Sequence, residues 1–318
     1  MSANIKVSLI ADIGGTNARF ALVDGGHYGG IHSYAVADYP APADAIRTFL
    51  AEAGLPHPPR KAVLAVAGPV EAGHGSLTNS AWEFDTEALE RDLGVSQIQL
   101  VNDFVALARG LPLFPGEDLY PIGGGEAMTG SPSAVLGPGT GLGVAAFVPA
   151  NGGIVLPTEG GHATLSAEDK RESEILAFFR DRFGHVSAER VLSGSGLEVL
   201  YEALRFVDGW DSASPLSTEE ISARALTGDC AASVVTLKTF CAMLGGFAGN
   251  VALTIGARGG VYIGGGILPR FPEFLAASDF RDRFEAKGRF RDWLAPIPTF
   301  VVTHPDPAFP GLMAMLKD

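Results

Sequence analysis

The stretch that decides the fold runs from Leu9 to Asp24 and reads LIADIGGTNARFALVD. Two apolar runs flank a short Gly-Gly-Thr turn, and Asp12 stands near the end of the first run. A short glycine loop between strands is an ordinary β-hairpin signal. Glycine also removes the side chain, so that backbone N–H groups can approach an anion. The stretch therefore predicts a hairpin and leaves open whether its turn also receives a ligand.

The whole chain has the composition of a globular protein, with 318 residues, of which 47% are apolar and 19% charged. That length predicts about two domains. The formal net charge of −13 argues against nucleic-acid binding, which needs a basic face, but it permits a local pocket for a small anion. Two cysteines cannot form a disulfide framework, and the first nine residues lack the apolar core of a signal peptide. We expect a cytoplasmic protein.

One uncharged segment, residues 239–257, is long enough to span a bilayer. It contains several glycines and the polar Asn250, and few strongly apolar side chains. This composition favours a buried helix whose small residues allow close packing, so no membrane is expected as a partner.

Short β-forming runs alternate with helical patterns in the first third of the chain. We expect strands in IKVSLIAD, ARFALVD, AVLAVAG and IQLVND, and helices in ADAIRTFLAEAG and TEALERDLG. Asp85 or Thr86 is positioned to cap the second helix, and Gly94 to end it. This order predicts an α/β domain with a mixed sheet.

The second half repeats the glycine turn. After a connection rich in glycine and proline, residues 134–148 read AVLGPGTGLGVAAFV, again two apolar runs around a turn that contains Gly139 and Thr140. The sequence has no Walker A motif, and its glycine turns lie between strands and do not open a helix, unlike a dinucleotide fingerprint. Phosphates held between two hairpins fit better, with Asp12 binding Mg²⁺ through water. The alternative is that Asp12 accepts hydrogen bonds from the N–H groups of its turn.

Polar residues gather at other strand and turn positions. LVNDF places Asn102 and Asp103 at the end of an apolar strand, where α/β sheets hold ligands, although both residues are also favoured helix caps. TEGGH contains Glu159 and His162, and GHVSAER contains Glu189 just inside an expected helix start. Taken singly, His162 would be a structural histidine and Glu189 an acid in the first turn of a helix. A metal site at Glu159 and His162 has little support, because the spacing suggests no third ligand. Together they suit a ring of sugar hydroxyls.

Seven motifs in fixed order resemble the bacterial glucokinase family, within the sugar kinase/actin/Hsp70 ATPase superfamily: ADIGGTNARFALV, TNSAW, LVNDF, LGPGTGLGVA, TEGGH, GHVSAERVLSGSGL and YIGGGILPRF. The resemblance implies an α/β protein with two ribonuclease-H-like (actin-like ATPase) domains flanking an interdomain cleft. Residues 1–110 with 304–318 would form the smaller domain, with the first phosphate hairpin and the catalytic aspartate. Residues 111–303 would form the larger domain, with the second hairpin, the sugar-binding Glu and His residues, and the adenosine segment.

The resemblance also implies the activity. It is ATP-dependent phosphorylation of D-glucose at the 6-hydroxyl, giving glucose 6-phosphate and ADP, the first step of glycolysis. Alternatives are a kinase of another hexose, or a non-catalytic actin-like nucleotide-binding regulator. Glucose, ATP and Mg²⁺ are the expected ligands, and a homodimer the expected assembly. No structural zinc is expected, because two cysteines cannot supply the cysteine-rich motif of the related ROK-type kinases.

The resemblance assigns roles to individual positions. Asp103 is implied as the general base that takes the proton of the sugar hydroxyl, and Asp12 as the residue that holds Mg²⁺ through water. The residues implied to bind the sugar are Asn79, Asn102, Asp103, Glu159, His162 and Glu189. The residues implied to bind the nucleotide are Asp12, Gly14, Gly15, Thr16, Asn17, Gly139, Thr140, Gly265 and Gly266.

Overall fold

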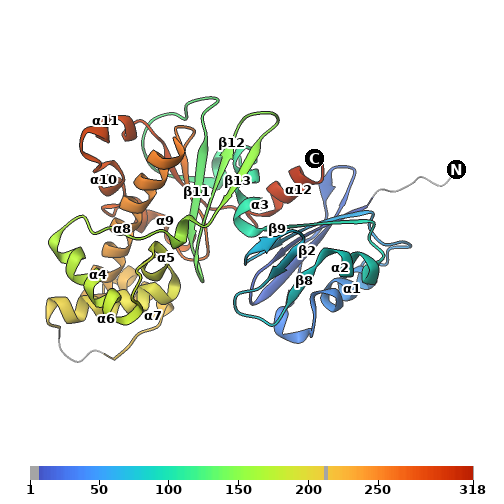
Figure 1. Ribbon diagram of the computed structural model, residues 1–318, viewed down its shortest axis with the longest axis horizontal. Helices are drawn as coiled ribbons and strands as arrows, with labels where there is room; N and C mark the ends of the chain where they lie inside the picture. The colour runs from blue at the N-terminus through green and yellow to red at the C-terminus, as the bar shows by residue number, and fades with distance from the viewer. Residues whose placement is uncertain (1–6, 211–213, 318) are drawn as a thin grey trace. The chain divides into compact units, whose positions relative to one another are not determined.

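The computed structural model describes residues 7–210 and 214–317, which fall into two compact units (Figure 1). The first unit contains the chain up to Phe114 and the chain from His304 onward. The second unit is continuous and runs from Pro115 to Thr303. The first unit is therefore built from two stretches that are far apart in the sequence.

The sheet of the first unit begins with the hairpin that the opening stretch predicts. Strands β1 (Ser8–Ile13) and β2 (Asn17–Asp24) pair antiparallel. Strand β1 also pairs parallel with β5 (Lys61–Val66), and β5 pairs parallel with β9 (Gln97–Asn102). In this register the last residues of the three parallel strands lie side by side, so that the strands end at one edge of the sheet. The other elements of this unit are β3 (His27–Tyr28), β4 (His32–Ala35), η1 (Val36–Asp38), α1 (Pro42–Glu52), β6 (Val70–Glu71), β7 (His74–Ser76), β8 (Glu83–Asp85), α2 (Thr86–Leu93), α3 (Asp103–Gly110), η2 (Leu111–Leu113) and α12 (Phe309–Met315).

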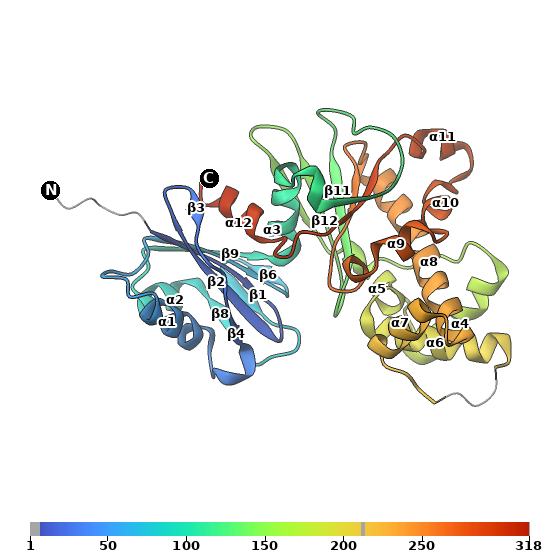
Figure 2. The ribbon, with the colours of Figure 1, turned by 180° about the vertical axis from the view of Figure 1, so that it is seen from behind.

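Helices cover both faces of this sheet: α1 and α2 lie on one face, and α3 and α12 on the other (Figures 1 and 2). Successive residues of a strand point to opposite faces. Leu9 accordingly packs in the cluster with α1 and α2, whereas Ile10 packs with Phe309 and Leu312 of α12. By the same alternation Asp12 belongs to the face that α3 and α12 cover.

The boundaries of α2 follow the predicted caps. The backbone N–H of Ala88 donates to Oδ1 of Asp85 at 3.0 Å, so Asp85 is the N-cap. Gly94 ends the helix in the left-handed region, with φ of 68°. Only glycine adopts that conformation without steric cost, which is why the helix stops there.

The second unit repeats the strand order of the first. Strands β11 (Ser133–Pro138) and β12 (Leu142–Val148) form an antiparallel hairpin, β11 pairs parallel with β14 (Val261–Ile263), and β14 pairs parallel with β15 (Thr299–Val302). This β12-β11-β14-β15 order matches β2-β1-β5-β9, and it confirms the predicted repeat and the ribonuclease-H-like fold class. The other elements are η3 (Gly116–Asp118), β10 (Leu119–Gly123), β13 (Ile154–Thr158), η4 (Gly160–His162), α4 (Lys170–Phe183), α5 (Ala188–Val191), α6 (Gly194–Asp208), α7 (Thr218–Thr227), α8 (Ala231–Ile255), η5 (Leu268–Arg270), α9 (Pro272–Ala276), α10 (Phe280–Glu285), η6 (Gly288–Phe290) and α11 (Arg291–Leu294).

The uncharged segment forms the greater part of α8, a helix of 25 residues that is long and apolar enough to cross a membrane. Of its most apolar stretch, 67% is buried inside the protein. Helix α10 packs along it (Figure 1). A side chain at Gly245 or Gly249 would clash with the backbone carbonyls of Phe280 and Phe284 in α10. The small residues thus permit the close packing that the sequence predicts.

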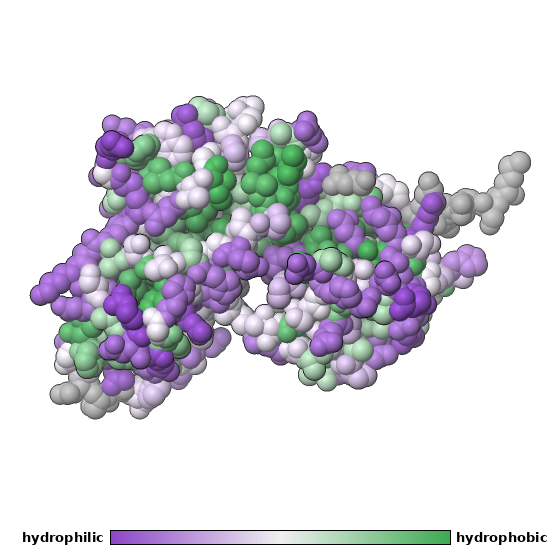
Figure 3. All heavy atoms as spheres, viewed as in Figure 1, coloured by the Kyte–Doolittle hydropathy of each residue, from purple (hydrophilic) through white to green (hydrophobic). Residues whose placement is uncertain are grey.

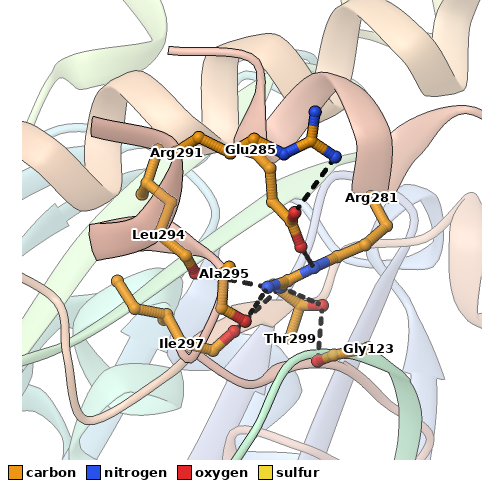
Figure 4. A network of polar contacts seen from close by, with 8 residues as sticks. All are labelled: Gly123, Arg281, Glu285, Arg291, Leu294, Ala295, Ile297 and Thr299. Atoms are coloured by element: carbon orange, nitrogen blue, oxygen red, sulfur yellow. Dashed lines mark hydrogen bonds and ion pairs between the residues drawn. The ribbon is translucent and has the colours of Figure 1, made fainter. Parts of the chain in front are cut away.

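A partly buried arginine holds together the end of α11 and the strands beside it (Figure 4). The side chain of Arg281 donates to Oε1 of Glu285 at 2.7 Å and to four further acceptors on Leu294, Ala295, Ile297 and Thr299. Thr299 in turn donates to the carbonyl of Gly123, at the end of β10. An arginine has five N–H donors, so these five hydrogen bonds use its full capacity.

Apolar side chains also reach the surface of the second unit (Figure 3). Phe206 of α6 is 75% exposed, and its ring lies 5.7 Å from that of Phe178 in α4. Ile154 and Leu156 on the edge strand β13 are each 43% exposed. These are the kinds of surface that protein contacts bury.

Candidate functional site

Two carboxylates of the first unit stand at the carboxyl edge of its parallel strands. Asp12 is the next-to-last residue of β1, and Asp103 follows β9 as the first residue of α3. The pKa of Asp103 is raised to about 7, chiefly by burial and also by the negative charge of Asp12. The hydrogen bond from the N–H of Phe104 lowers it in part. Asp103 is therefore close enough to Asp12 for the two charges to interact.

A charged pair from elsewhere in the unit flanks Asp12. Arg19 lies opposite Asp12 in the β1–β2 register, and its Nη1 is 3.6 Å from Oδ2 of Asp12 and 3.8 Å from Oδ1 of Asp306. Burial raises the pKa of Asp12 to about 6, while the guanidinium of Arg19 lowers it and the carboxylate of Asp306 raises it. Arg19 thus favours the ionised form of Asp12, the form that can bind a cation.

Asn102 acts as the N-cap of α3. Its Oδ1 accepts a hydrogen bond from the N–H of Phe104 at 2.9 Å, and its Nδ2 donates to the carbonyl of Gly68 at 3.1 Å. The capping alternative weighed from the sequence is therefore observed for Asn102. These bonds fix the start of α3 and with it the position of Asp103, whereas a contact between Asn102 and a sugar stays a prediction.

The first glycine turn is closed by a hydrogen bond from the N–H of Gly14 to the carbonyl of Asn17, at 2.9 Å. Neither Gly14 nor Gly15 has a positive φ. A Cβ at these positions would lie 3.7 Å from the carbonyl oxygen of Asn17 and 3.5 Å from Cβ of Asn79, both ordinary contacts. The fold therefore does not require glycine at positions 14 and 15. The neighbouring Thr16 is exposed, and Asn79 lies next to the turn.

The second glycine turn has the same property at its tip. A Cβ on Gly139 would come no closer than 3.7 Å to another residue, the N of Gly266, and one on Gly266 would meet nothing within 4 Å. Gly265 is different, because its φ is +82° and a side chain there would clash with the carbonyl of Pro138. The structure thus brings Gly139 and Gly266 together, next to the exposed Thr140.

Three predicted sugar-binding residues of the second unit form a cluster, in which Glu159 and Glu189 flank His162. Nε2 of His162 is 3.8 Å from Oε2 of Glu159, and Nδ1 is 3.8 Å from Oε1 of Glu189. Glu189 lies in α5, which begins directly after its N-cap, Ser187, as the expected helix start near Glu189 indicates. All three side chains are accessible, with 78%, 60% and 32% of Glu159, His162 and Glu189 exposed. A cluster of two acceptors around a histidine is suited to hydroxyl groups.

Comparisons with known proteins agree along the whole chain. The sequence model of the family described as Glucokinase matches residues 9–318. The chain belongs to the glucokinase family. A glucokinase of Nitrobacter hamburgensis is 48% identical over 305 residues, which cover 96% of this chain and 95% of the relative. A glucokinase of Paramagnetospirillum magneticum is 46% identical over 318 residues, 98% of each. The crystal structure of a glucokinase from an Antarctic psychrotroph has a TM-score of 0.87 and 38% identity, with 99% of both chains covered.

Family membership confirms the resemblance inferred from the motifs, and it makes the chain an enzyme, a kinase. The roles of single residues in this glucokinase-family chain stay predictions. Within residues 7–210 and 214–317, no cluster of three or more His, Cys, Asp and Glu side chains is arranged to hold a metal ion. A Mg²⁺ ion that keeps its waters needs only one or two carboxylates, and Asp12 at the open strand edge fits that requirement.

Sequence reasoning missed Arg19, Asp306 and Gly141 as parts of this glucokinase-family site. Arg19 could have been found by counting across the hairpin, since its position opposite Asp12 follows from the turn length. Gly141 lies where a side chain would clash with the carboxylate of Glu189. No local pattern indicates that contact, or the one between Asp306 and Arg19, because each joins residues distant in the sequence.

Proposed function

We propose that this member of the glucokinase family transfers the γ-phosphoryl group of ATP to the 6-hydroxyl of D-glucose, giving glucose 6-phosphate and ADP in the first step of glycolysis. The observation that carries the proposal is a set of glycines that the fold does not require: Gly14 and Gly15 in one hairpin turn, Gly139 in the matching hairpin turn of the second unit, and Gly266 beside Gly139. Bare backbone at such turns lets N–H groups approach phosphate oxygens.

Phosphoryl transfer demands positioning and charge stabilisation more than covalent chemistry. We assign the triphosphate to two turns, one formed by Gly14, Gly15, Thr16 and Asn17 and the other by Gly139 and Thr140. We assign the adenosine part of ATP to Gly265 and Gly266. Asp12 would hold Mg²⁺ through its water shell, and the bound ion would offset the negative charge of the phosphates. The position of Asp12 beside Arg19 supports this role, because the guanidinium favours the carboxylate form.

Asp103 would accept the proton of the attacking hydroxyl. A general base works best when its pKa lies near the operating pH, and burial raises the pKa of Asp103 to about 7. The sugar would be oriented by Asn79, Asn102, Glu159, His162 and Glu189. A site built to bond hydroxyls rejects an analogue that lacks one, because protein groups are then left unpaired. Glucose is therefore the proposed substrate, with other hexoses as the competing candidates.

Replacing the proposed base tests the mechanism directly. General-base catalysis contributes ~10²–10⁴-fold, so Asp103→Asn should lower kcat by at least about a hundredfold. The KM for glucose should change little, because asparagine keeps the shape of the side chain. ADP formation is followed in a coupled assay, and near-normal turnover of the variant would refute the assignment.

The same assay on the unaltered protein separates the kinase from its alternatives. A nucleotide-binding regulator would form ADP at the same low rate with and without glucose. Rates measured with glucose, fructose and mannose at equal concentrations, each with several phosphate donors, identify the preferred sugar and the preferred donor. For assembly and location we propose a cytoplasmic homodimer; the exposed apolar side chains of β13 and α6 support the dimer. Sedimentation at several concentrations tests the dimer.

A further inference from the structure

Two carboxylates flank His162 at equal distances but differ in what else they touch. Glu159 and Glu189 each lie 3.8 Å from one ring nitrogen. Glu159 is 78% exposed, whereas Glu189 is 32% exposed. The second oxygen of Glu189, Oε2, accepts a hydrogen bond of 2.9 Å from the backbone N–H of Leu142. One carboxylate therefore joins the proposed sugar cluster to the first residue of β12.

Leu142 comes directly after the glycine turn that we assign to phosphate. The carboxylate of Glu189 fills the space where a side chain at Gly141 would lie, since a Cβ there would clash with Oε2. The turn itself is held by a bond from the N–H of Gly139 to the carbonyl of Gly141, at 2.8 Å. A shift of the Glu189 carboxylate would thus displace the turn, both through the hydrogen bond to Leu142 and through the contact with Gly141.

The backbone between the His162 cluster and the Gly139–Thr140 turn is closely packed. Gly161, beside His162, packs so closely on the carbonyl of Leu142 that a side chain there would clash. The N–H of Ala188 donates to the carbonyl of Ala163 at 2.8 Å, which fixes the start of α5 against η4. Closely packed groups of this kind transmit small displacements.

We infer that Glu189 is a positioning residue that couples sugar binding to nucleotide binding: its carboxylate, shared between the His162 cluster and the backbone of Leu142, places the Gly139–Thr140 turn. The inference rests on the proposed function and deepens it. A hydroxyl that bonds Oε1 would hold the carboxylate, and with it the turn, in the arrangement that accepts phosphate. Coupling between two sites is reciprocal and commonly amounts to ~5–150-fold in affinity.

The test measures the coupling factor, the ratio of dissociation constants for the non-hydrolysable nucleotide AMPPNP with Mg²⁺, without and with saturating glucose. We expect a ratio of about five or more for the unaltered protein. Glu189→Ala removes the shared carboxylate, and Gly141→Ala displaces it while keeping the glutamate. Both variants should bring the ratio close to one. Titration calorimetry supplies the constants, and thermal unfolding confirms that each variant is folded.

Glu159→Ala is the matched control, because Glu159 contacts the same histidine but not the turn. It should weaken glucose binding and, once saturated with glucose, keep the unaltered coupling ratio. Loss of coupling in Glu159→Ala to the same degree, or full coupling in Gly141→Ala and Glu189→Ala, would overturn the inference. If one of these two fails to fold, the other decides. An unaltered protein without glucose-stimulated ADP formation refutes the proposed function, whereas normal turnover with a ratio of one refutes the coupling alone.

Discussion

Asp103 carries a stability cost along with its proposed chemistry. Burial and the charge of Asp12 raise its pKa to about 7, well above the value of an aspartate in an unfolded chain, about 3.9. Between these two values the folded protein binds more protons than the unfolded one, so stability falls as pH rises through about 4 to 7. Below the window both states are protonated, and above it both are ionised.

Asp103→Asn should therefore be more stable than the unaltered protein at pH 8, by on the order of 1 kcal/mol, because asparagine cannot ionise. At pH 4 the two proteins should unfold at similar temperatures. Thermal unfolding at the two pH values gives the comparison. Equal melting temperatures at pH 8 would mean that the environment of Asp103 does not disfavour its charge.

The substitution Gly15→Ala tests whether glycine is needed at this position for ATP binding or for the backbone conformation. Its φ is not positive and a Cβ would meet only an ordinary contact, so stability should hold or rise by ~0.4–1 kcal/mol. The KM for ATP should rise about tenfold, equivalent to ~1.4 kcal/mol of lost binding. Kinetics with varied ATP and urea unfolding supply the two readouts.

Gly25→Ala is the control in the same unit, because Gly25 has a φ of +56° and open space around it. Alanine there should lower stability by about 1 kcal/mol and leave the KM for ATP unchanged. A Gly15→Ala protein with an unaltered KM for ATP would contradict the phosphate role of the turn.

At the residue scale, the sequence identified positions better than contacts. The position of Asp103 directly after a strand was predicted correctly from LVNDF, whereas its role as a base stays a prediction. The hydrogen bond from Asn102 to the carbonyl of Gly68, and the ion pair between Arg19 and Asp306, depend on side-chain orientation and on contacts distant in the sequence. Local patterns do not contain that information.

Among the elements, the short segments from α10 to β15 depend on one side chain. Arg281 donates five hydrogen bonds, of which three go to the backbone carbonyls of Leu294, Ala295 and Ile297. Lysine keeps the charge but has a single nitrogen with three donors, so it leaves buried acceptors unpaired.

Arg281→Lys should lower the free energy of unfolding by on the order of 2 kcal/mol or more, measured by chemical denaturation. Arg91→Lys is the control, since Arg91 makes an exposed pair with Glu87 at 3.9 Å and should change stability by less than ~0.5 kcal/mol. Equal stability of the two variants would show that the network of Arg281 contributes nothing beyond its charge.

The elements with a clear local signal were predictable, and the shortest strands were not. Hairpins β1–β2 and β11–β12 consist of apolar runs around a glycine turn, and α2 has both of its caps in the sequence. The strands β6, β7 and β8, of two or three residues each, have no periodicity to detect. They form because neighbouring segments complete their hydrogen bonds.

For the whole molecule, the discontinuity of the first unit has a measurable consequence. Leu312 of α12 is fully buried in the cluster that also contains Ile10 of β1. Leu312→Ala should cost ~2–5 kcal/mol, because a cavity is left beneath the sheet. Leu113→Ala, at a position that is 53% exposed, should cost far less. Thermal unfolding compares them, and equal effects would mean that α12 is not part of the folding core.

At this scale the repeat was readable because the same glycine turn occurs once in each half, whereas the shared strand order became visible only in the structure. The return of the chain to the first unit at His304 came only from the family resemblance. Nothing in the composition of the last fifteen residues says which sheet they cover, because an apolar helix face fits any apolar sheet surface.

The placement of α12 sets an order of events during translation. Phe309 and Leu312 follow the whole second unit in the chain, so the part of the N-terminal sheet that α12 covers stays exposed until that unit has been synthesised. The intervening unit, by contrast, has all its strands and helices by Thr303. Of the two units, the one whose synthesis begins first is therefore completed second, and in the interval the apolar surface that α12 will cover is accessible to solvent.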